Sequence, residues 1–389
     1  MPHDKRVGLS PEQCLYLKKI YPHVEFYIQP SDWRSISNQE YSDAGLIIQE
    51  DIAMCDIFIG IKEVPKPDLI PGKIYLFFSH TIKKQPHNKE LLKKILEHKI
   101  QLIDYECLVD DNDNRIIGFG RYAGIVGAYN TIRAYGLKYK KFKLKAAQDC
   151  EHRADLEKEL KKAKLSPIKI LVTGGGRVAN GAMEILGAMK MRRVTPYEFV
   201  MFPFSEPVYA QLHSSDYHYL IEGNGWDNEH FHQHPELYQS AFKKFTDKCD
   251  MLLHCAFWNP NAPRLFSLNE MADTKFKIRI IGDITCDING SIPSTTFATT
   301  IEEPYFDFDA VRKQIVQGLH VNTITTMAVD NLPCSLPRDA SESFGQELID
   351  KVLPLLFNDP ENALIERASI AKYGKLTKRF EYLSDYVKD

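Results

Sequence analysis

The stretch Ile168-Lys-Ile-Leu-Val-Thr-Gly-Gly-Gly-Arg-Val-Ala-Asn-Gly-Ala182 decides the fold of this chain. Residues 168–172 are apolar and β-branched, which predicts one buried parallel strand, and helical spacing of apolar residues follows the glycines. The turn between strand and helix has the spacing of a dinucleotide-binding turn. Gly174 permits a tight turn, Gly176 lets a pyrophosphate approach the backbone, and Ala179 allows close helix–strand packing. Glycine-rich turns without ligands are common, but the position between a strand and a helix favours a cofactor turn.

The composition is that of an ordinary globular protein. The 389 residues, of which 44% are hydrophobic and 26% charged, predict about two to three domains with ample cores. A net charge of −3 gives no general attraction to nucleic acid or acidic lipid. Eight scattered cysteines without a C-x-x-C pair indicate reduced thiols. With neither a membrane-spanning run nor a signal peptide, we predict a cytoplasmic protein that binds neither nucleic acid nor membranes.

Polar side chains follow the strands predicted for the N-terminal region. These strands cover 56–61, 73–80 and 100–105, and they deliver Lys62, His80 and Glu106. Ligands bind α/β proteins at the C-terminal ends of parallel strands. Taken singly, Lys62 is interpreted as a lysine that extends its charged end from the strand into solvent, and His80 as a histidine with a structural role. Their arrival at the same sheet edge favours a site.

The central region shows a close-packing helix and then a hinge. Ser10 and Pro11 predict the start of an earlier helix, while small residues at helical spacing over 120–134 predict a helix that packs backbone to backbone. A basic stretch at 136–145 is the expected first hinge. We therefore expect two Rossmann-like, doubly wound α/β domains separated by a cleft.

The second half of the chain predicts the rest of the cofactor domain. A strand at 199–203 is expected after the glycine-rich unit, with Glu206 as a late candidate for the acid that binds an NAD ribose, so NAD and NADP both stay open. Further strands are predicted at 250–255 and 277–283, an amphipathic helix at 309–319, and helices at 341–356 and 362–386. His230, His232 and His234 alternate, but without a fourth ligand a polar surface segment is favoured over a zinc site.

Taken in order, these segments resemble the lysine-forming saccharopine dehydrogenases and, more closely, the lysine–ketoglutarate reductase domains of the alanine dehydrogenase/transhydrogenase superfamily. The resemblance covers nearly the whole chain. Its motifs are Ile61-Lys-Glu63, Phe77-Phe-Ser-His-Thr-Ile-Lys83, Leu102-Ile-Asp-Tyr-Glu106, Phe119-Gly-Arg-Tyr-Ala-Gly124, Asn261-Ala-Pro-Arg-Leu265, Gly282-Asp-Ile-Thr-Cys-Asp287 and Asp330-Asn-Leu-Pro333. It implies an NAD- or NADP-dependent enzyme that interconverts saccharopine with L-lysine and 2-oxoglutarate.

The resemblance also implies roles for individual residues. Lys62 and His80 fall on the family's acid–base pair, and imine formation from an amine and a ketone needs such proton transfer. The substrate-binding residues implied are Arg6, Glu63, Glu106, Arg115, Phe119 and Asp330, with the two arginines holding carboxylates. The cofactor-binding residues implied are Gly174, Gly176, Arg177, Ala179, Asp283 and Asp287. No metal is implied.

The domain organisation follows from the same resemblance. Residues 1–135 with 324–389 are expected to form the substrate domain and residues 136–323 the dinucleotide-binding domain, in a monomer or small homo-oligomer. The sequence departs from the family in three places. The strand that precedes the Arg6 position in the family is missing, which is expected to weaken the first sheet and the Arg6 clamp. Asn331 stands where one branch of the family has histidine. The Gly174 turn is shorter than in the NAD-linked enzymes.

Two alternatives remain. Another amino-acid or opine dehydrogenase of the superfamily would use the same hydride chemistry on a different oxo acid. A NAD(P)-binding regulator that has lost catalysis would agree with the missing strand, but the presence of Lys62 and His80 argues against it.

Overall fold

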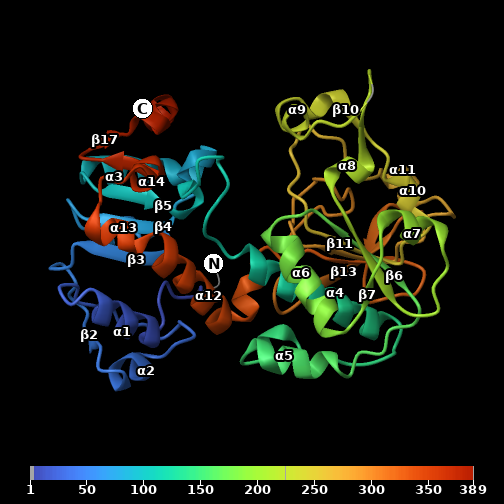
Figure 1. The fold of residues 1–389 in the computed structure, drawn as a ribbon, viewed down its shortest axis with the longest axis horizontal. Coiled ribbons are helices and arrows are strands. Elements are labelled where there is room, and N and C mark those ends of the chain that lie inside the picture. The colour runs from blue at the N-terminus through green and yellow to red at the C-terminus, as the bar shows by residue number, and fades with distance from the viewer. Residues whose placement is uncertain (1–3, 224, 389) are drawn as a thin grey trace. The chain divides into compact units, whose positions relative to one another are not determined.

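The computed structural model describes residues 4–223 and 225–388 and divides the chain into two compact units (Figure 1). Unit 1 contains the chain up to Phe119 and from Pro337 onward, and unit 2 is Gly120–Leu336. The expected domains instead met at 135/136 and 323/324. The difference arises because helix α4 (Gly120–Lys138) packs within unit 2, against helix α6 (Arg177–Ala188).

Unit 1 is built on a five-stranded mixed sheet in the order β17-β16-β5-β4-β3, in which β3, β4 and β5 are parallel. A separate parallel pair, β1-β2, accompanies it. The strands of unit 1 are β1 (Tyr27–Ile28), β2 (Ile47–Ile48), β3 (Ile57–Lys62), β4 (Ile74–Phe78), β5 (Gln101–Asp104), β16 (Ser369–Lys372) and β17 (Lys375–Leu376). Three parallel strands that end at one edge agree with the expected doubly wound arrangement.

The helices of unit 1 come from both ends of the chain. They are α1 (Pro11–Ile20), α2 (Asn38–Asp43), α3 (Lys89–Glu97), α12 (Pro337–Lys351), α13 (Leu353–Asn358), α14 (Ala363–Ala368) and α15 (Ser384–Val387). Helix α1 begins with the expected capping box, in which Ser10 accepts from the Gln13 backbone N–H and Gln13 accepts from the Ser10 N–H. The core of the unit is apolar, and Leu76, Phe77, Leu92 and Leu102 are fully buried in it.

Unit 2 contains an eight-stranded sheet in the order β14-β13-β15-β12-β11-β6-β8-β7. Six of these strands are parallel, and β13 and β14 form an antiparallel edge. The strands are β6 (Lys169–Thr173), β7 (Arg192–Arg193), β8 (Val208–Leu212), β11 (Met251–His254), β12 (Ile280–Asp283), β13 (Tyr305–Asp309), β14 (Gln314–Val316) and β15 (Ile324–Met327), with a separate hairpin of β9 (His218–Leu220) and β10 (Tyr238–Ser240). The glycine-rich stretch thus begins on a central, fully buried strand.

The other helices of unit 2 are short. They are α5 (Arg153–Leu160), α7 (Pro196–Met201), α8 (Ser214–Tyr217), α9 (Asn228–Gln233), α10 (Lys243–Thr246) and α11 (Leu268–Met271). By contrast, α4 and α6 are long and cross with their backbones in contact. A Cβ added to Gly124 would lie 1.9 Å from the Val178 carbonyl oxygen, and one added to Gly181 would lie 2.0 Å from the Arg121 carbonyl oxygen. The predicted backbone-close packing of the 120–134 helix is confirmed.

Three predicted elements are wrong. The strand at 199–203 is instead the end of helix α7, because Thr195 and Glu198 form a capping box around Pro196. The helix at 309–319 is a hairpin of β13 and β14, turned by an Asp309 side chain that accepts from two backbone N–H groups. The segment at 362–386 contains the β16–β17 hairpin, whose turn residues Tyr373 and Gly374 both have positive φ.

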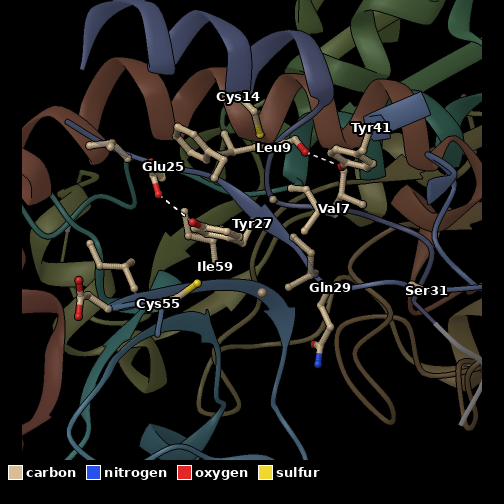
Figure 2. Close-up of a pocket in the computed structure, with 18 of the residues that line it drawn as sticks. Val7, Leu9, Cys14, Glu25, Tyr27, Gln29, Ser31, Tyr41, Cys55 and Ile59 are labelled. Carbon is tan, nitrogen blue, oxygen red and sulfur yellow. Dashed lines mark hydrogen bonds between the residues drawn. The ribbon is translucent and has the colours of Figure 1, made fainter. Parts of the chain in front are cut away.

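A cavity of about 790 Å³ lies between two open strand edges of unit 1 (Figure 2). Among the described residues, β3 pairs with β4 alone and β1 with β2 alone. Figure 2 shows lining side chains from both regions, among them Tyr27 of β1 and Ile59 of β3. We call this space the β1–β3 cavity.

Candidate functional site

The C-terminal edge of the unit 1 sheet brings His80, Glu106 and Arg115 together. His80 follows strand β4, and its Nδ1 lies 3.1 Å from Oε2 of Glu106. Nη2 of Arg115 donates to the other carboxylate oxygen at 2.6 Å. His80 also adopts a left-handed backbone with φ of 54°, a conformation that costs energy and recurs at functional sites. The structure thus brings together three residues that the sequence analysis named separately.

The Glu106 carboxylate is held ionised beneath the imidazole. Burial alone raises the pKa of Glu106, but the His80 hydrogen bond and the positive charges of Arg115 and Lys83 outweigh burial and lower it to about 2. The side chain is only 4% exposed, whereas the His80 side chain is 30% exposed. The result is an anchored carboxylate that orients an accessible imidazole.

A second buried carboxylate fixes the loop that carries His80. Oδ2 of Asp104 accepts from the Ser79 backbone N–H at 3.0 Å and also from the Ser79 hydroxyl. Oδ1 of Asp104 accepts from the Glu106 backbone N–H at 2.7 Å. Asp104 therefore links the ends of β4 and β5 and sets the spacing between His80 and Glu106.

Lys62 and Glu63 lie at the end of the adjacent strand. Lys62 is the exposed last residue of β3 and pairs in register with Phe78 of β4, two residues before His80. Glu63 is exposed too and lines a smaller cavity of about 380 Å³. The strand order therefore places Lys62 and His80 on neighbouring strand ends.

Arg6 and Phe119 form a second cluster in unit 1. The Arg6 guanidinium lies 4.1 Å from the centre of the Phe119 ring, and Phe119 stacks on Phe344 at 4.5 Å. Asp4 binds the same guanidinium through both carboxylate oxygens, at 3.0 and 2.5 Å. Arg6 does hold a carboxylate, as a clamp would, but that carboxylate belongs to this chain.

In unit 2, the glycine-rich turn has the geometry that a dinucleotide needs. Gly174 has a φ of 95°, and a Cβ there would lie 3.1 Å from the backbone of Ala256. Gly176 caps helix α6 without a side-chain hydrogen bond, and a Cβ there would meet only open space. Arg177 is the first residue of α6, and Ala179 is fully buried behind it. The open helix N-terminus can therefore accept a pyrophosphate.

The strand beside the turn shows that Glu206 was the wrong candidate for the ribose acid. The first strand after the turn that pairs with β6 is β8, and Glu206 lies before β8 begins, on the surface and 3.5 Å from Arg192. The C-terminal end of β8 carries Gln211 instead. Its amide nitrogen donates to the Gly174 carbonyl at 2.9 Å, and its amide oxygen accepts from Arg193 at 2.6 Å. Residue spacing alone did not reveal these two residues, because finding them requires the strand order.

Three acids surround Cys286 at the ends of β12 and β15. Burial, reinforced by the charges of Asp283, Asp330 and Asp287, raises the pKa of Cys286 to about 12. Asp283 is 1% exposed, and burial together with Asp287 raises its pKa to about 7. One oxygen of Asp283 and one of Asp287 are buried without a hydrogen-bond partner. Such orphaned oxygens fit a polar ligand group at these strand ends.

The alternating histidines do not converge. His230 bonds the Tyr238 hydroxyl at 3.0 Å, while His234 lies 3.5 Å from Glu236. Within residues 4–223 and 225–388, no group of three His, Cys, Asp or Glu side chains could hold a metal ion. Over the same residues, no helix combines the length and apolarity that a membrane crossing requires.

Comparison with known proteins supports the class of protein. Residues 1–126 match the alanine dehydrogenase/PNT N-terminal domain family. The whole fold is similar to an L-alanine dehydrogenase (TM-score 0.63, 13% identity, covering 99% of this chain and 97% of that one) and to a transhydrogenase from Sinorhizobium meliloti (TM-score 0.56, 15% identity, 97% of both). The α/β fold predicted from the sequence is confirmed, and it is similar to the folds of these two proteins.

Sequence relatives narrow the class further. The chain is 30% identical over 98% of its length to the mitochondrial alpha-aminoadipic semialdehyde synthase of Mus musculus, of which it covers 46%. It is 25% identical to the NAD(+)-dependent, L-lysine-forming saccharopine dehydrogenase of Emericella nidulans, covering 94% of this chain and 92% of that protein. The chain spans about half the length of the synthases it matches. These matches confirm the predicted resemblance to these enzymes.

Proposed function

We propose that the protein interconverts saccharopine with L-lysine and 2-oxoglutarate by hydride transfer to or from a nicotinamide cofactor. The observation that carries this proposal is the His80 imidazole held by Glu106, next to the strand that ends in Lys62. The saccharopine dehydrogenase relative, matched over nine-tenths of its length, gives independent support. We assign acid–base chemistry to unit 1 and cofactor binding to unit 2.

The chemistry requires protons to move at two atoms. Forming an imine from the amine of lysine and the ketone of 2-oxoglutarate protonates the departing oxygen and deprotonates the nitrogen, and Lys62 and His80 share these transfers. The bound nicotinamide would supply the hydride that reduces the imine. Arg115 and Arg6 would hold substrate carboxylates, with Asp4 giving way at Arg6. Glu63, Phe119 and Asp330 remain proposed substrate contacts.

We further propose that the preferred cofactor is NADP rather than NAD. An NAD-binding strand ends in an acid that bonds the ribose hydroxyls, whereas β8 ends in Gln211-Leu212, with the Arg193 guanidinium beside Gln211. Asp216, the first acid in the chain after β8, accepts from the His213 N–H at 2.7 Å. A cation at this position suits the 2′-phosphate of NADP. The fungal relatives are named as NAD(+) enzymes, so this is a difference within the family.

A spectrophotometric assay tests the reaction. Oxidation of NADPH or NADH is followed with lysine and 2-oxoglutarate, and then with ammonia or other amines in place of lysine. Turnover that requires lysine supports the proposal. Turnover with another amine or oxo acid would identify a different dehydrogenase of the superfamily, and cofactor binding without any turnover would identify a regulator.

His80→Gln should reduce kcat by about 10²-fold or more, because general acid–base catalysis contributes about 10²–10⁴. Dissociation constants for NADPH, measured by quenching of protein fluorescence, should stay unchanged, because His80 belongs to unit 1. Equal turnover in the variant would remove His80 from the mechanism.

Arg193→Ala should weaken NADPH binding on the order of tenfold or more while leaving NADH binding unchanged, because a bond to a charged group is lost. Arg192→Ala is the matched control. Its guanidinium lies on the same two-residue strand but lies beside Glu206. Equal weakening of NADH and NADPH by Arg193→Ala would contradict a phosphate contact.

A further inference from the structure

A completely buried histidine lies at the C-terminal end of strand β11, and the proposed chemistry leaves it without a role. His254 is 1% exposed. Its Nδ1 lies 2.8 Å from the Thr173 hydroxyl, and its Nε2 lies 2.6 Å from the Ser291 hydroxyl. The strand register aligns Thr173, His254 and Asp283 across three adjacent parallel strands. This row of polar side chains crosses the same sheet edge as the Gly174 turn.

The hydrogen bonds suit a neutral imidazole. Thr173 Oγ1 accepts from the Cys255 backbone N–H at 3.2 Å, so the hydroxyl proton is available to Nδ1 of His254. In a neutral imidazole one ring nitrogen donates and the other accepts, so either tautomer can bond both hydroxyls, each of which can donate or accept. Burial lowers the pKa of His254 to about 3, so the ring is neutral. A neutral ring with one acceptor and one donor satisfies both hydroxyls.

Each partner of His254 leads into a different loop of the candidate cofactor site. Thr173 directly precedes Gly174 of the glycine-rich turn. Ser291 lies in the loop after β12 that also carries Asp287. The third loop follows His254 itself, and its Ala256 backbone packs against Gly174. One imidazole therefore joins the ends of β6 and β11 to the loop that follows β12.

We propose that His254 is a positioning residue that fixes the spacing between the glycine-rich turn and the Asp287 loop, and so orders the site for a dinucleotide. Its imidazole bonds Thr173 and Ser291, and the reacting atoms are left to other groups. The inference rests on the proposed function, because it assumes that a dinucleotide binds unit 2. Two buried hydrogen bonds that join separate segments suit this role, because each resists movement of one segment relative to another.

The test compares three variants. His254→Phe keeps an aromatic ring and removes both bonds, whereas His254→Gln keeps a donor near the Nε2 position. Met251→Ala is the matched control, because Met251 is fully buried at the opposite end of the same strand. Dissociation constants for NADPH and NADH are measured by fluorescence quenching. Amide hydrogen exchange is measured without ligand. Steady-state kinetics then give kcat and the KM for the dinucleotide.

We expect His254→Phe to weaken dinucleotide binding about tenfold and to raise the dinucleotide KM with a smaller effect on kcat. His254→Gln should recover part of that affinity. Amides of residues 174–180 and 284–295 should exchange faster together in His254→Phe, and Met251→Ala should lower stability without these effects. The losses of dinucleotide affinity in Thr173→Val and Ser291→Ala should not add up in the double variant, because both substitutions remove hydrogen bonds of the same imidazole.

Two results would overturn the inference. One is wild-type affinity and wild-type exchange of both loops in His254→Phe. The other is equal loss of affinity in Met251→Ala, which would mean that general destabilisation explains the effect. Failure of the proposed function gives a different pattern, because the wild-type protein would then bind no dinucleotide while the exchange measurement would still report whether His254 couples the two loops.

Discussion

Two carboxylates at the residue scale show opposite responses to burial. Glu106 is buried among cations, and the His80 bond with Arg115 and Lys83 reverses the effect of burial, so its pKa falls to about 2. Asp283 is buried beside Asp287, and its pKa rises to about 7. Glu106 is therefore a permanent negative charge that orients His80, whereas Asp283 changes its protonation near neutral pH.

Asp283 should make the protein less stable as the pH rises. Its folded pKa of about 7 lies above the ordinary 3.8, so the folded state binds the proton more tightly. The stabilisation is complete below about pH 4 and is lost as the pH rises through about 7, which amounts to about 4 kcal/mol at 1.36 kcal/mol per pKa unit. Asp283→Asn should flatten this dependence, measured as the free energy of unfolding by urea from pH 4 to 8. Parallel profiles in the two proteins would contradict it.

Sequence reasoning found candidate site residues where the end of a single strand was enough to locate them. Lys62, His80 and Glu106 each follow an apolar run, and the observed strands place the latter two in contact. Arg193, Gln211 and His254 were missed, because their roles depend on which strands are neighbours. Periodicity shows that a strand exists but not what lies beside it. Glu206 was a wrong candidate for the ribose-binding acid for the same reason.

At the element scale, the crossing of α4 and α6 brings two helix backbones into close contact. The Gly124 position faces backbone atoms of α6, which cannot move aside as a flexible side chain would. Glycines at such a crossing allow the two helix backbones to approach closely. Elsewhere inside a helix, a glycine lowers stability relative to alanine. The sequence predicted this contact from small residues at helical spacing.

Gly124→Ala should destabilise the protein by about 3 kcal/mol, at the upper end of overpacking costs, because its Cβ would force the two helices apart. Gly187→Ala is the matched control, since it lies in α6 with nothing within 4 Å of an added Cβ. That change should stabilise by about 0.5–1 kcal/mol. Chemical denaturation of both variants measures the difference, and similar stabilities would mean that the crossing is not tight in solution.

Elements were predicted best where strong local signals agreed. The strand, glycine turn and helix at 168–191 were found because periodicity and turn residues pointed the same way. The hairpins at β13–β14 and β16–β17 were missed, because Asp309 and the Tyr373-Gly374 pair are turn signals inside sequences that also permit a helix.

At the scale of the whole molecule, the fold class followed from the sequence but the unit boundaries did not. Helix α4 was assigned to the first domain because it precedes the basic stretch, whereas its packing against α6 places it in unit 2. Strand β3 was predicted as buried, as its apolar sequence suggests. It is instead half-buried along the β1–β3 cavity, because nothing among the described residues pairs with its second edge.

The second edge of strand β3, which pairs with no described strand, has a practical consequence for the purified protein. Apolar strands whose amide groups lack partners act as templates for other chains, and natural proteins commonly guard them with lysine or proline. Concentrated samples should therefore form oligomers through β3, detected by static light scattering over a dilution series. Ile57→Lys should suppress this self-assembly while leaving secondary structure intact, and identical scattering from both proteins would show that the cavity walls already shield the strand.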